Sequence, residues 1–312
     1  MSEFLGIDTS NYTTSAAVYD DETGKIIQNK KLLPVKAGEC GLRQSDAVFH
    51  HVSQLTEVAS DIVRNTGKIK AVCVSSRPRN IEGSYMPCFL PGKMAGELLS
   101  AAYKCDIYYT AHQIGHIAAA LYSCGRTDLF AEQFISFHVS GGTTDVLLCR
   151  PGTDEIISAE HIGGTLDLNA GQVIDRTGVM LGLDFPCGKE LEKLALQSHK
   201  SFKIKTAVKG TGCCLSGIEN QCRRMFESGE TKEDVAGFCI ASVYSAVRDI
   251  TKVVIKKYGN LPLIYAGGVM SCRIIADKIS EEFGGQFARP EFSSDNAAGV
   301  ALIAAEKYKR NH

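Results

Sequence analysis

The sequence predicts an α/β protein made of two similar halves. Apolar segments typical of strands alternate with helix-forming segments along the chain, a pattern that favours layers of helices on sheets. Two strand-turn-strand units, at residues 4–19 and 134–149, each carry an aspartate with serines or threonines at the turn. Their similarity indicates an internal duplication, with one nucleotide bound between the halves.

The first half begins with the strands expected at residues 4–10 and 13–19. The turn after Gly6-Ile7-Asp8 is small and polar, so its amides and hydroxyls would suit a phosphate. The elements expected next are a helix, a strand, a loop and a helix, at residues 47–65, 69–75, 76–91 and 92–103. Arg77 and Arg79 of the loop are either solvated or contact a ligand.

The second half begins with strands on either side of the turn at residues 140–145. The later elements expected are helices at residues 166–181, 190–197, 216–226, 235–258 and 297–308, and strands at 261–266 and near 287. Four lysines, at positions 200, 203, 205 and 209, are read as one face of a strand. That face is either solvated or a contact for a polyanion.

The most chemically specific feature is the pair His112 and His116. The segment at residues 111–121 is rich in Ala, Ile and Leu and lacks proline, so a helix is expected, and the i, i+4 spacing places both imidazoles on one face. The pair could hold one metal ion, or it could simply line a half-buried helix. Zinc peptidases need a glutamate after the first histidine, but Gln113 stands there and cannot act as a base.

The composition is that of a globular protein. The 312 residues are 44% hydrophobic and 22% charged, and the net charge of -1 predicts no general attraction to nucleic acid. We see neither a signal peptide nor an apolar stretch near the roughly 20 residues of a membrane helix. The 12 cysteines form no CxxC pair, so we expect small buried residues in a reducing cytoplasm.

Seven ordered motifs then carry a resemblance to a known family. They are His112-x3-His116, His138-Val139-Ser140-Gly141-Gly142, Gly164-Thr165-x-Asp167-x2-Ala170-Gly171-x3-Asp175, Pro186-x-Gly188-x3-Glu192-Lys193, Leu215-Ser216-Gly217, Ala266-Gly267-Gly268-Val269 and Asp295-Asn296. The sequence resembles the TsaD family, also called the glycoprotease or peptidase M22 family, whose members transfer a threonylcarbamoyl group to tRNA.

The resemblance implies an actin-like (ASKHA) fold of two duplicated lobes with a nucleotide and metal cleft between them. The expected division is a first lobe at residues 1–110, a second lobe with the metal and nucleotide site at 111–295, and a C-terminal helix at 296–312 that packs back on the lobes. By the same resemblance, the metal ligands are His112, His116 and Asp295. His138 stands where some relatives carry tyrosine, and it is either a fourth ligand or a plain strand residue. The metal would be iron or zinc, or possibly magnesium.

The resemblance also implies a site for ATP or an acyl-adenylate. Ser140, Gly141 and Gly142 would hold the phosphate or the acyl-adenylate. The residues expected around the rest of the nucleotide are Asp175 and Glu192 at the ribose, Gly188 beside the adenosine, and Gly267, Gly268 and Cys272 on its other side.

Three departures mark the chain as a divergent paralogue within that family. Relatives carry asparagine at the position of Cys272 and acidic residues at the positions of Tyr12 and Thr13. They also carry Gly-Pro-Gly where this sequence has Arg77-Pro78-Arg79. The last two differences fall where the acceptor is expected to approach.

Three functions remain open from the sequence. The first is metal-dependent transfer of threonylcarbamoyl from threonylcarbamoyl-AMP to N6 of a tRNA adenosine, an acyltransferase reaction without a side-chain nucleophile. The second is carbamoyl transfer to another acceptor. The third is a non-catalytic nucleotide-binding partner of a standard family member. The partners expected are tRNA, an adenine nucleotide and proteins of the threonylcarbamoyl-adenosine pathway, with no membrane.

Overall fold

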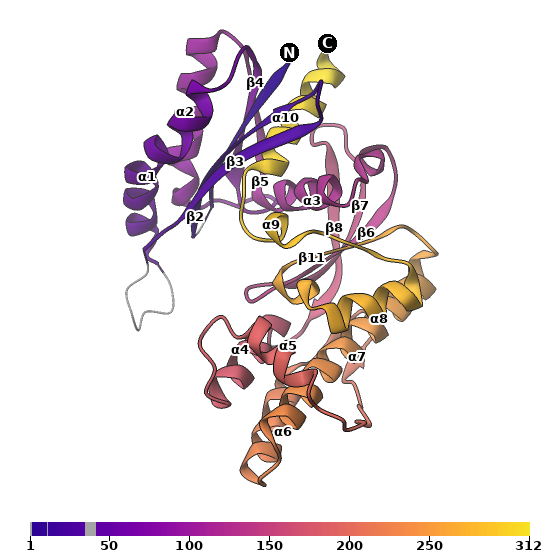
Figure 1. Cartoon of the computed structure of the whole chain (residues 1–312). Helices are drawn as coiled ribbons and strands as arrows, with labels where there is room; N and C mark the ends of the chain where they lie inside the picture. Colours follow the sequence, from indigo (N-terminus) through magenta and orange to yellow (C-terminus); the bar gives the residue numbers. More distant parts are fainter. Residues whose placement is uncertain (1, 11, 35–41) are drawn as a thin grey trace. The chain divides into compact units, whose positions relative to one another are not determined.

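The computed structural model describes residues 2–10, 12–34 and 42–312, and it confirms the α/β class with one five-stranded and one seven-stranded sheet (Figure 1). The chain divides into two compact units. Unit 1 comprises Met1–Ala131, Pro151–Ala159 and Glu291–His312, and unit 2 comprises Glu132–Arg150 and Glu160–Pro290. Among the described residues, no helix has the length and apolar character needed to cross a membrane.

The first ten elements, in chain order, are β1 (Glu3–Ser10), β2 (Thr13–Asp20), β3 (Lys25–Leu32), α1 (Gln44–Arg64), β4 (Ile69–Arg77), α2 (Leu90–Tyr103), β5 (Asp106–Ala111), α3 (His112–Ser123), β6 (Phe134–Val139) and β7 (Thr144–Pro151). They are followed by β8 (Ile157–Thr165), α4 (Ala170–Met180), α5 (Gly188–Ala195), β9 (Val208–Lys209), β10 (Gly212–Cys213), α6 (Ser216–Glu227), α7 (Lys232–Tyr258), β11 (Leu263–Ala266), α8 (Arg273–Phe283), β12 (Gln286–Phe287), α9 (Pro290–Ser293) and α10 (Ala298–Asn311).

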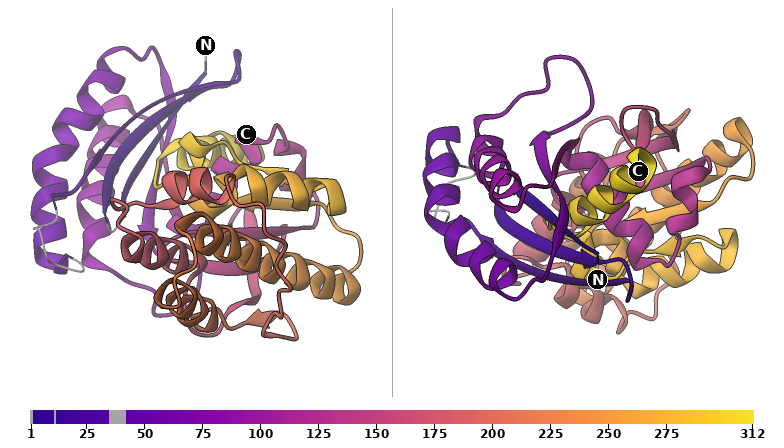
Figure 2. Two further views of the ribbon diagram at one scale, coloured as in Figure 1. Left: turned by 60° about the horizontal axis from the view of Figure 1, so that its bottom comes forward. Right: turned by 90° about the horizontal axis from the view of Figure 1, so that it is seen from above.

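The sheet of unit 1 has the order β3-β2-β1-β4-β5, with β1 antiparallel to β2 and parallel to β4. Side chains alternate across it. Leu5 and Ile7 pack with Leu55 of α1 in one cluster, and α1 and α2 cover that face (Figure 1). On the other face, a Cβ added to Gly6 would lie 2.3 Å from the backbone nitrogen of Ala301, so α10 lies directly on β1 (right-hand view of Figure 2).

The sheet of unit 2 repeats this arrangement. Its order is β12-β11-β6-β7-β8-β10-β9, so β8-β7-β6-β11-β12 matches β3-β2-β1-β4-β5. The pair β6 and β7 is antiparallel, whereas β6 and β11 are parallel, as in unit 1. The internal duplication predicted from the two strand-turn-strand units is therefore confirmed at the level of topology.

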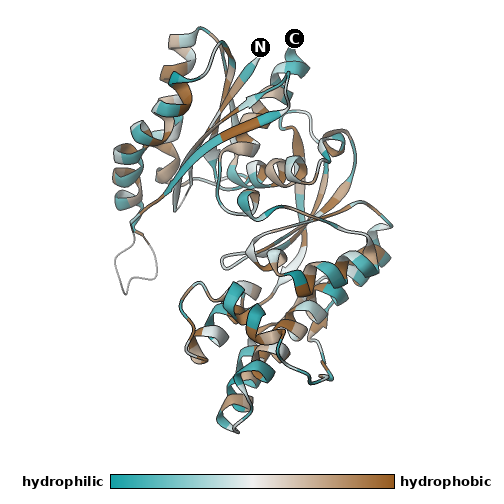
Figure 3. Ribbon diagram, in the orientation of Figure 1, coloured by the Kyte–Doolittle hydropathy of each residue, from teal (hydrophilic) through white to brown (hydrophobic). Residues whose placement is uncertain are grey.

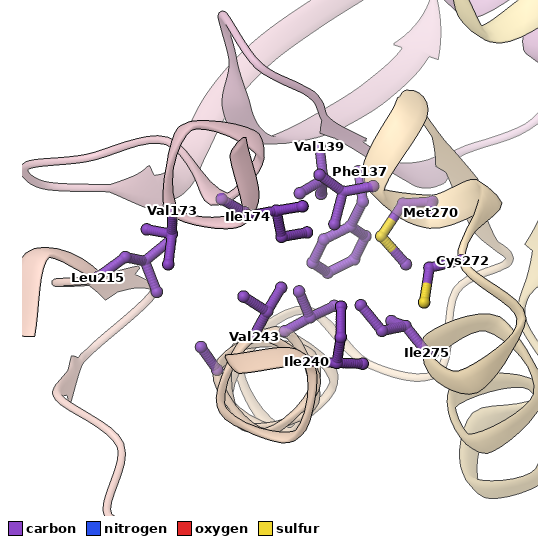
Figure 4. Close-up of a cluster of buried hydrophobic side chains, with 14 of the residues drawn as sticks. Phe137, Val139, Val173, Ile174, Leu215, Ile240, Val243, Met270, Cys272 and Ile275 are labelled. Carbon is purple, nitrogen blue, oxygen red and sulfur yellow. The ribbon is translucent and has the colours of Figure 1, made fainter. Parts of the chain in front are cut away.

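The core of unit 2 gathers around α7. Ile240 and Val243 of this helix lie in one apolar cluster with Phe137 of β6 and Ile275 of α8 (Figure 4). Both α7 and α8 carry hydrophobic and hydrophilic residues side by side (Figure 3), as expected of helices that bury one face.

The two compact units do not coincide with the expected lobes. The sequence placed residues 111–295 in the second lobe, whereas α3 and Asp295 lie in unit 1. The physical reason is packing, because α3 lies against α10, which itself covers β1 and β4. The expected boundary after residue 110 falls within β5, inside unit 1.

Several local predictions were also incomplete. Strands β3, β5 and β8 were not predicted. β3 is mostly exposed and lacks clear alternation, and β5 runs straight into a helix. The basic segment at residues 200–209 is not a strand except at Val208–Lys209. Lys200 lies 2.9 Å from Asp234 and also pairs with Glu230, so its charge is neutralised within the unit.

The cysteines agree with the expectation of free thiols. The eleven cysteines within the described residues are all free, and eight of them are buried. Cys105, Cys124 and Cys214 are half-buried, and Cys40 lies outside the described residues.

Candidate functional site

The metal site predicted from His112 and His116 starts at a junction between a strand and a helix. β5 ends at Ala111, and His112 is the first residue of α3, so the strand fixes where the helix begins. His116 follows one turn later, and both imidazoles are half-buried. The Nε2 atoms of the two rings lie 3.0 Å apart, which confirms that they face the same point.

Asp295 reaches this point because two helices cross at glycines. A Cβ on Gly299 of α10 would lie 1.9 Å from the carbonyl oxygen of Gly115 in α3, so only glycine allows this approach. The turn before α10 is held by Asn296, whose amide donates to the carbonyl of Ser294 at 2.6 Å and accepts from the N–H of Ala298 at 3.0 Å. Asp295 therefore lies beside the histidines.

The three side chains fit a single metal ion. Oδ1 of Asp295 lies 3.2 Å from Nε2 of His116 and 3.6 Å from Nε2 of His112. Ligand atoms bound at about 2.0–2.1 Å to a tetrahedral ion are roughly 3.3 Å apart, which matches these separations. This is also the one group of three or more His, Cys, Asp or Glu ligands that meets such spacing within the described ranges. Two imidazoles and one carboxylate favour iron or zinc over magnesium, which prefers oxygen ligands.

The surroundings stabilise positive charge at this point. Nδ1 of His112 lies 2.8 Å from Oδ2 of Asp8, a carboxylate that is 1% exposed. Burial alone would lower the pKa of His112, but Asp8 and Asp295 raise it to about 10. Burial likewise opposes ionisation of Asp295, yet the two histidines hold its pKa well below the ordinary value. The negative charges of Asp8 and Asp295, which favour a proton on His112, would also attract a metal cation.

Asp8 was not predicted as part of this site. The sequence assigned its turn to a phosphate. Asp8, Thr9 and Ser10 are all buried, and Asp8 and Thr9 accept hydrogen bonds within unit 1. A phosphate contact of this turn stays a prediction. Thr13 was likewise missed, and its hydroxyl donates to Oδ2 of Asp295 at 3.4 Å. The strand-to-strand pairing of β1 and β4 that brings Asp8 toward α3 has no local signature in the sequence.

His138 belongs to unit 2, so its place in the ligand set stays a prediction. It lies on β6 and is half-buried. Its register partner on β7 is Asp145, and directly opposite residues of an antiparallel pair share one face of the sheet. Asp145 in turn lies 3.3 Å from Nε2 of His161. A carboxylate beside His138 is the arrangement that orients an imidazole toward a metal.

The turn at residues 140–143 of unit 2 has the form expected of a phosphate loop. The N–H of Ser140 donates to the carbonyl of Thr143 at 2.7 Å, and this bond closes the turn. Gly141 and Gly142 are exposed, and a Cβ on either would meet no atom within 4 Å. Their backbone is therefore accessible to a ligand. Gly171 packs against Gly141, which places the start of α4 on the turn.

The remaining residues predicted for the nucleotide all lie in unit 2. Some of them face open space, and the others contact neighbouring segments. Gly188 and Gly268 face open space, whereas Gly267 has a φ of 101° and touches Val139, so it is needed for the backbone path. Asp175 accepts from the N–H of Cys187 at 2.9 Å, and Glu192 accepts from the N–H of Ile274 at 3.2 Å. Each carboxylate thus uses one oxygen to hold a neighbouring segment.

Cys272 directly precedes α8, and its side chain is 8% exposed and lies in the apolar cluster beside Met270 and Ile275 (Figure 4). Burial and, to a smaller extent, the neighbouring carboxylate of Glu192 raise the pKa of its thiol to about 12, so the sulfur stays protonated. A contact of Cys272 with the nucleotide stays a prediction.

Arg77, which the sequence left as solvated or ligand-binding, is engaged within unit 1. Its guanidinium lies 2.7 Å from Oε1 of Glu155, and Nζ of Lys307 lies 3.0 Å from Oε2 of the same carboxylate. Glu155 is 6% exposed, so this three-charge cluster ties β4 to α10 in a buried setting.

Known proteins resemble this chain over nearly its whole length. The family model described as TsaD, tRNA N6-adenosine threonylcarbamoyltransferase, matches residues 26–302. A similar curated protein is the tRNA N6-adenosine threonylcarbamoyltransferase of Archaeoglobus fulgidus, which is 26% identical over 99% of this chain and 92% of its own length. A second, from Methanopyrus kandleri, bears the same name and is 25% identical over 95% of this chain and 85% of its own length.

Solved structures show the fold. Component A of the (R)-2-hydroxyglutaryl-CoA dehydratase of Acidaminococcus fermentans superposes with a TM-score of 0.57 at 18% identity, over 99% of this chain and all of that one. Full-length HypF, solved with phosphate and nucleotide bound, gives a TM-score of 0.61 at 14% identity, over 98% of this chain and 55% of HypF. These are actin-like ASKHA nucleotide-binding folds, which confirms the predicted fold class. With the family model matching most of its length, the chain belongs to the TsaD family of tRNA-modifying transferases.

Proposed function

We propose that this protein transfers a threonylcarbamoyl group from threonylcarbamoyl-AMP to N6 of an adenosine in tRNA, and that the reaction depends on a metal held by His112, His116 and Asp295. Membership of the TsaD family supports the transfer. The observation that carries the metal dependence is the convergence of two imidazole nitrogens and one carboxylate oxygen within 3.6 Å of one another.

A metal bound there would supply a Lewis acid that polarises the carbamoyl carbonyl. The protein's own contribution is to keep the three ligands in place before substrate arrives. The crossing at Gly115 and Gly299 fixes the two helices, and Asn296 fixes the turn that carries Asp295. A prearranged set of ligands lowers the cost of organising the transition state.

The chemistry needs no side-chain nucleophile, and the thiols of Cys272 and of Cys187, the neighbour of the predicted nucleotide residue Gly188, fit that requirement. Burial raises the pKa of Cys187 and also that of Cys272. Because the thiolate is the nucleophilic form of cysteine, these groups are poor candidates for a covalent intermediate. The N6 amine of the tRNA adenosine would instead attack the carbamoyl carbonyl directly. The bond between that carbon and the phosphate oxygen would break, AMP would leave, and the amine would lose a proton.

For the adenylate, we propose the loops of unit 2. The open backbone at Gly141 and Gly142 would accept the phosphate, and Gly188 and Gly268 leave room for the nucleoside. The oxygens of Asp175 and Glu192 that do not hold neighbouring segments would accept bonds from the ribose hydroxyls. His138 is proposed as a fourth metal ligand on the basis of its pairing with Asp145.

The direct test is a transfer assay with purified protein, threonylcarbamoyl-AMP and unmodified tRNA, read by mass analysis of the nucleosides. We expect threonylcarbamoyl-adenosine with the wild-type protein and at least about 100-fold less with His112→Ala. His199→Ala is the matched control, because it removes an exposed imidazole of unit 2 that has no part in the proposed site. Adenylate that binds without forming the modified nucleoside would contradict the proposal.

A further inference from the structure

The carboxylate of Asp8 has the surroundings of a residue that holds another group in place. Its Oδ1 accepts from the N–H of Ser10 at 2.8 Å, and its Oδ2 accepts from the hydroxyl of Ser75. Asp8 is 1% exposed and lies on β1, while Ser75 lies on the parallel neighbour β4. Donors from two strands therefore fix the carboxylate without any contact to solvent.

The remaining partner of Asp8 is His112. Nδ1 of that ring lies 2.8 Å from Oδ2, and a carboxylate can only accept, so Nδ1 carries the proton. The other nitrogen, Nε2, points to His116 and Asp295. An imidazole with its proton fixed on Nδ1 offers the lone pair of Nε2 to a metal.

We propose that Asp8 is a positioning residue of the metal site, which selects the Nδ1–H form of His112 and aims Nε2 at the metal. The inference rests on the metal site of the proposed function. It assigns to the first strand-turn-strand unit the orientation of a metal ligand. Carboxylate partners of this kind typically change metal affinity about 10- to 100-fold when they are altered.

Asp8→Asn tests this role with almost no change in volume. Asparagine has one acceptor oxygen, and the N–H of Ser10 requires it. The NH2 group of the asparagine then faces Nδ1 of His112. Because NH2 donates, Nδ1 must accept, and the ring proton must lie on Nε2. The opposite orientation would keep an acceptor oxygen at Nδ1 of His112, but it would place the NH2 group against the N–H of Ser10, so that two donors face each other. We therefore expect the first orientation, in which His112 loses its Nδ1–H form.

The matched control is Ser15→Ala. Ser15 is 1% exposed and donates to the backbone carbonyl of Asp8 at 3.2 Å, so the variant disturbs the same strand pair but leaves the carboxylate intact. His112→Ala marks the complete loss of this ligand. Urea unfolding of all variants separates a change in folding from a change in the metal site.

The experiment measures Zn²⁺ affinity of the full chain, after removal of metal, by competition with a chromophoric chelator. We expect Asp8→Asn to bind Zn²⁺ about 10- to 100-fold more weakly, and Ser15→Ala to bind within about twofold of wild type. Affinity of Asp8→Asn equal to wild type, with His112→Ala clearly impaired, would overturn the inference and leave the metal site standing. Failure of the wild type itself to bind Zn²⁺ would overturn both.

A second measurement needs no variant. Nitrogen-15 spectra of the Zn²⁺-loaded wild-type protein, labelled at histidine, report which ring nitrogen of His112 carries a proton. We expect Nδ1–H for His112. A proton on Nε2, or none on Nδ1, would contradict the role of Asp8 even if Asp8→Asn failed to fold.

Discussion

The two units share one strand order but use their first hairpins in opposite ways. In unit 1, the hairpin of β1 and β2 buries its polar side chains, and Asp8 faces His112 within the unit. In unit 2, the hairpin of β6 and β7 has an open turn with Gly141 and Gly142 exposed. One hairpin uses a buried side chain to hold His112, a proposed metal ligand, and the other exposes backbone that we propose binds a phosphate.

The comparison extends to the helices that follow the fifth strands. α3 follows β5, and α10 comes after β12 in the second repeat, yet both belong to unit 1 and cross at Gly115 and Gly299. The proposed metal ligands come from the first turn of α3 and from the turn before α10. Duplication thus supplied equivalent positions, and individual side chains gave them different chemistry.

The largest effect should follow loss of a ligand in unit 1. Asp295→Ala removes one of three ligand atoms, so we expect Zn²⁺ affinity to fall by at least about 100-fold, more than for a supporting residue. Adenine nucleotide affinity should not change, because the proposed nucleotide residues lie in unit 2. Calorimetric titration of both ligands checks this, with Glu291→Ala, an exposed carboxylate nearby, as the control. Weakened nucleotide binding would show that Asp295 of unit 1 also affects the nucleotide site, against the assignment of the two ligands to separate units.

The next effect concerns the helix crossing. In Gly299→Ala, the new methyl group would meet the backbone of Gly115, and we expect unfolding in urea to become easier by about 1–3 kcal/mol. Gly217→Ala is the control, because a Cβ there meets nothing within 4 Å, and alanine in a helix should be neutral or stabilising. Equal stability of the two variants would refute the close crossing.

A smaller effect is expected at the open turn of unit 2. Gly142→Leu places a large side chain over accessible backbone, so we expect adenine nucleotide affinity to fall about tenfold, or 1.4 kcal/mol, with Zn²⁺ affinity unchanged. Fluorescence titration with a labelled nucleotide measures the loss. If affinity is retained, the turn at residues 140–143 does not hold the phosphate.

The smallest effect is expected at Cys272. Its thiol packs in the apolar cluster of unit 2, so Cys272→Ala should change nucleotide affinity by no more than about twofold, while removing a small buried group costs some stability. The same titration checks this. A clear loss of nucleotide affinity would support the contact between Cys272 and the nucleotide that the sequence resemblance implied.

Prediction from sequence worked where the signal was local. The spacing of His112 and His116 gave the helix and its face, and the two strand-turn-strand units indicated the duplication. It failed where contacts join distant segments. Asp8 lies 104 positions before His112, and the ion pair of Arg77 with Glu155 joins residues 78 positions apart. Neither partner can be chosen without knowing the sheet order.

The lobe boundary failed for the same reason. Nothing near residue 111 shows that α3 will pack against the last helix of the chain, since the small residues Gly115 and Gly299 acquire meaning only as a pair. Cys272 was assigned to the nucleotide by its position in a motif, and its packing in the apolar cluster of unit 2 could not be seen from that position.

The most direct test of the central claim is anomalous diffraction from crystals grown with Zn²⁺, with data collected on both sides of the zinc absorption edge. The account predicts one strong peak within about 2.0–2.1 Å of Nε2 of His112, Nε2 of His116 and a carboxylate oxygen of Asp295. A peak bound by other residues, with these three side chains unliganded, would contradict it.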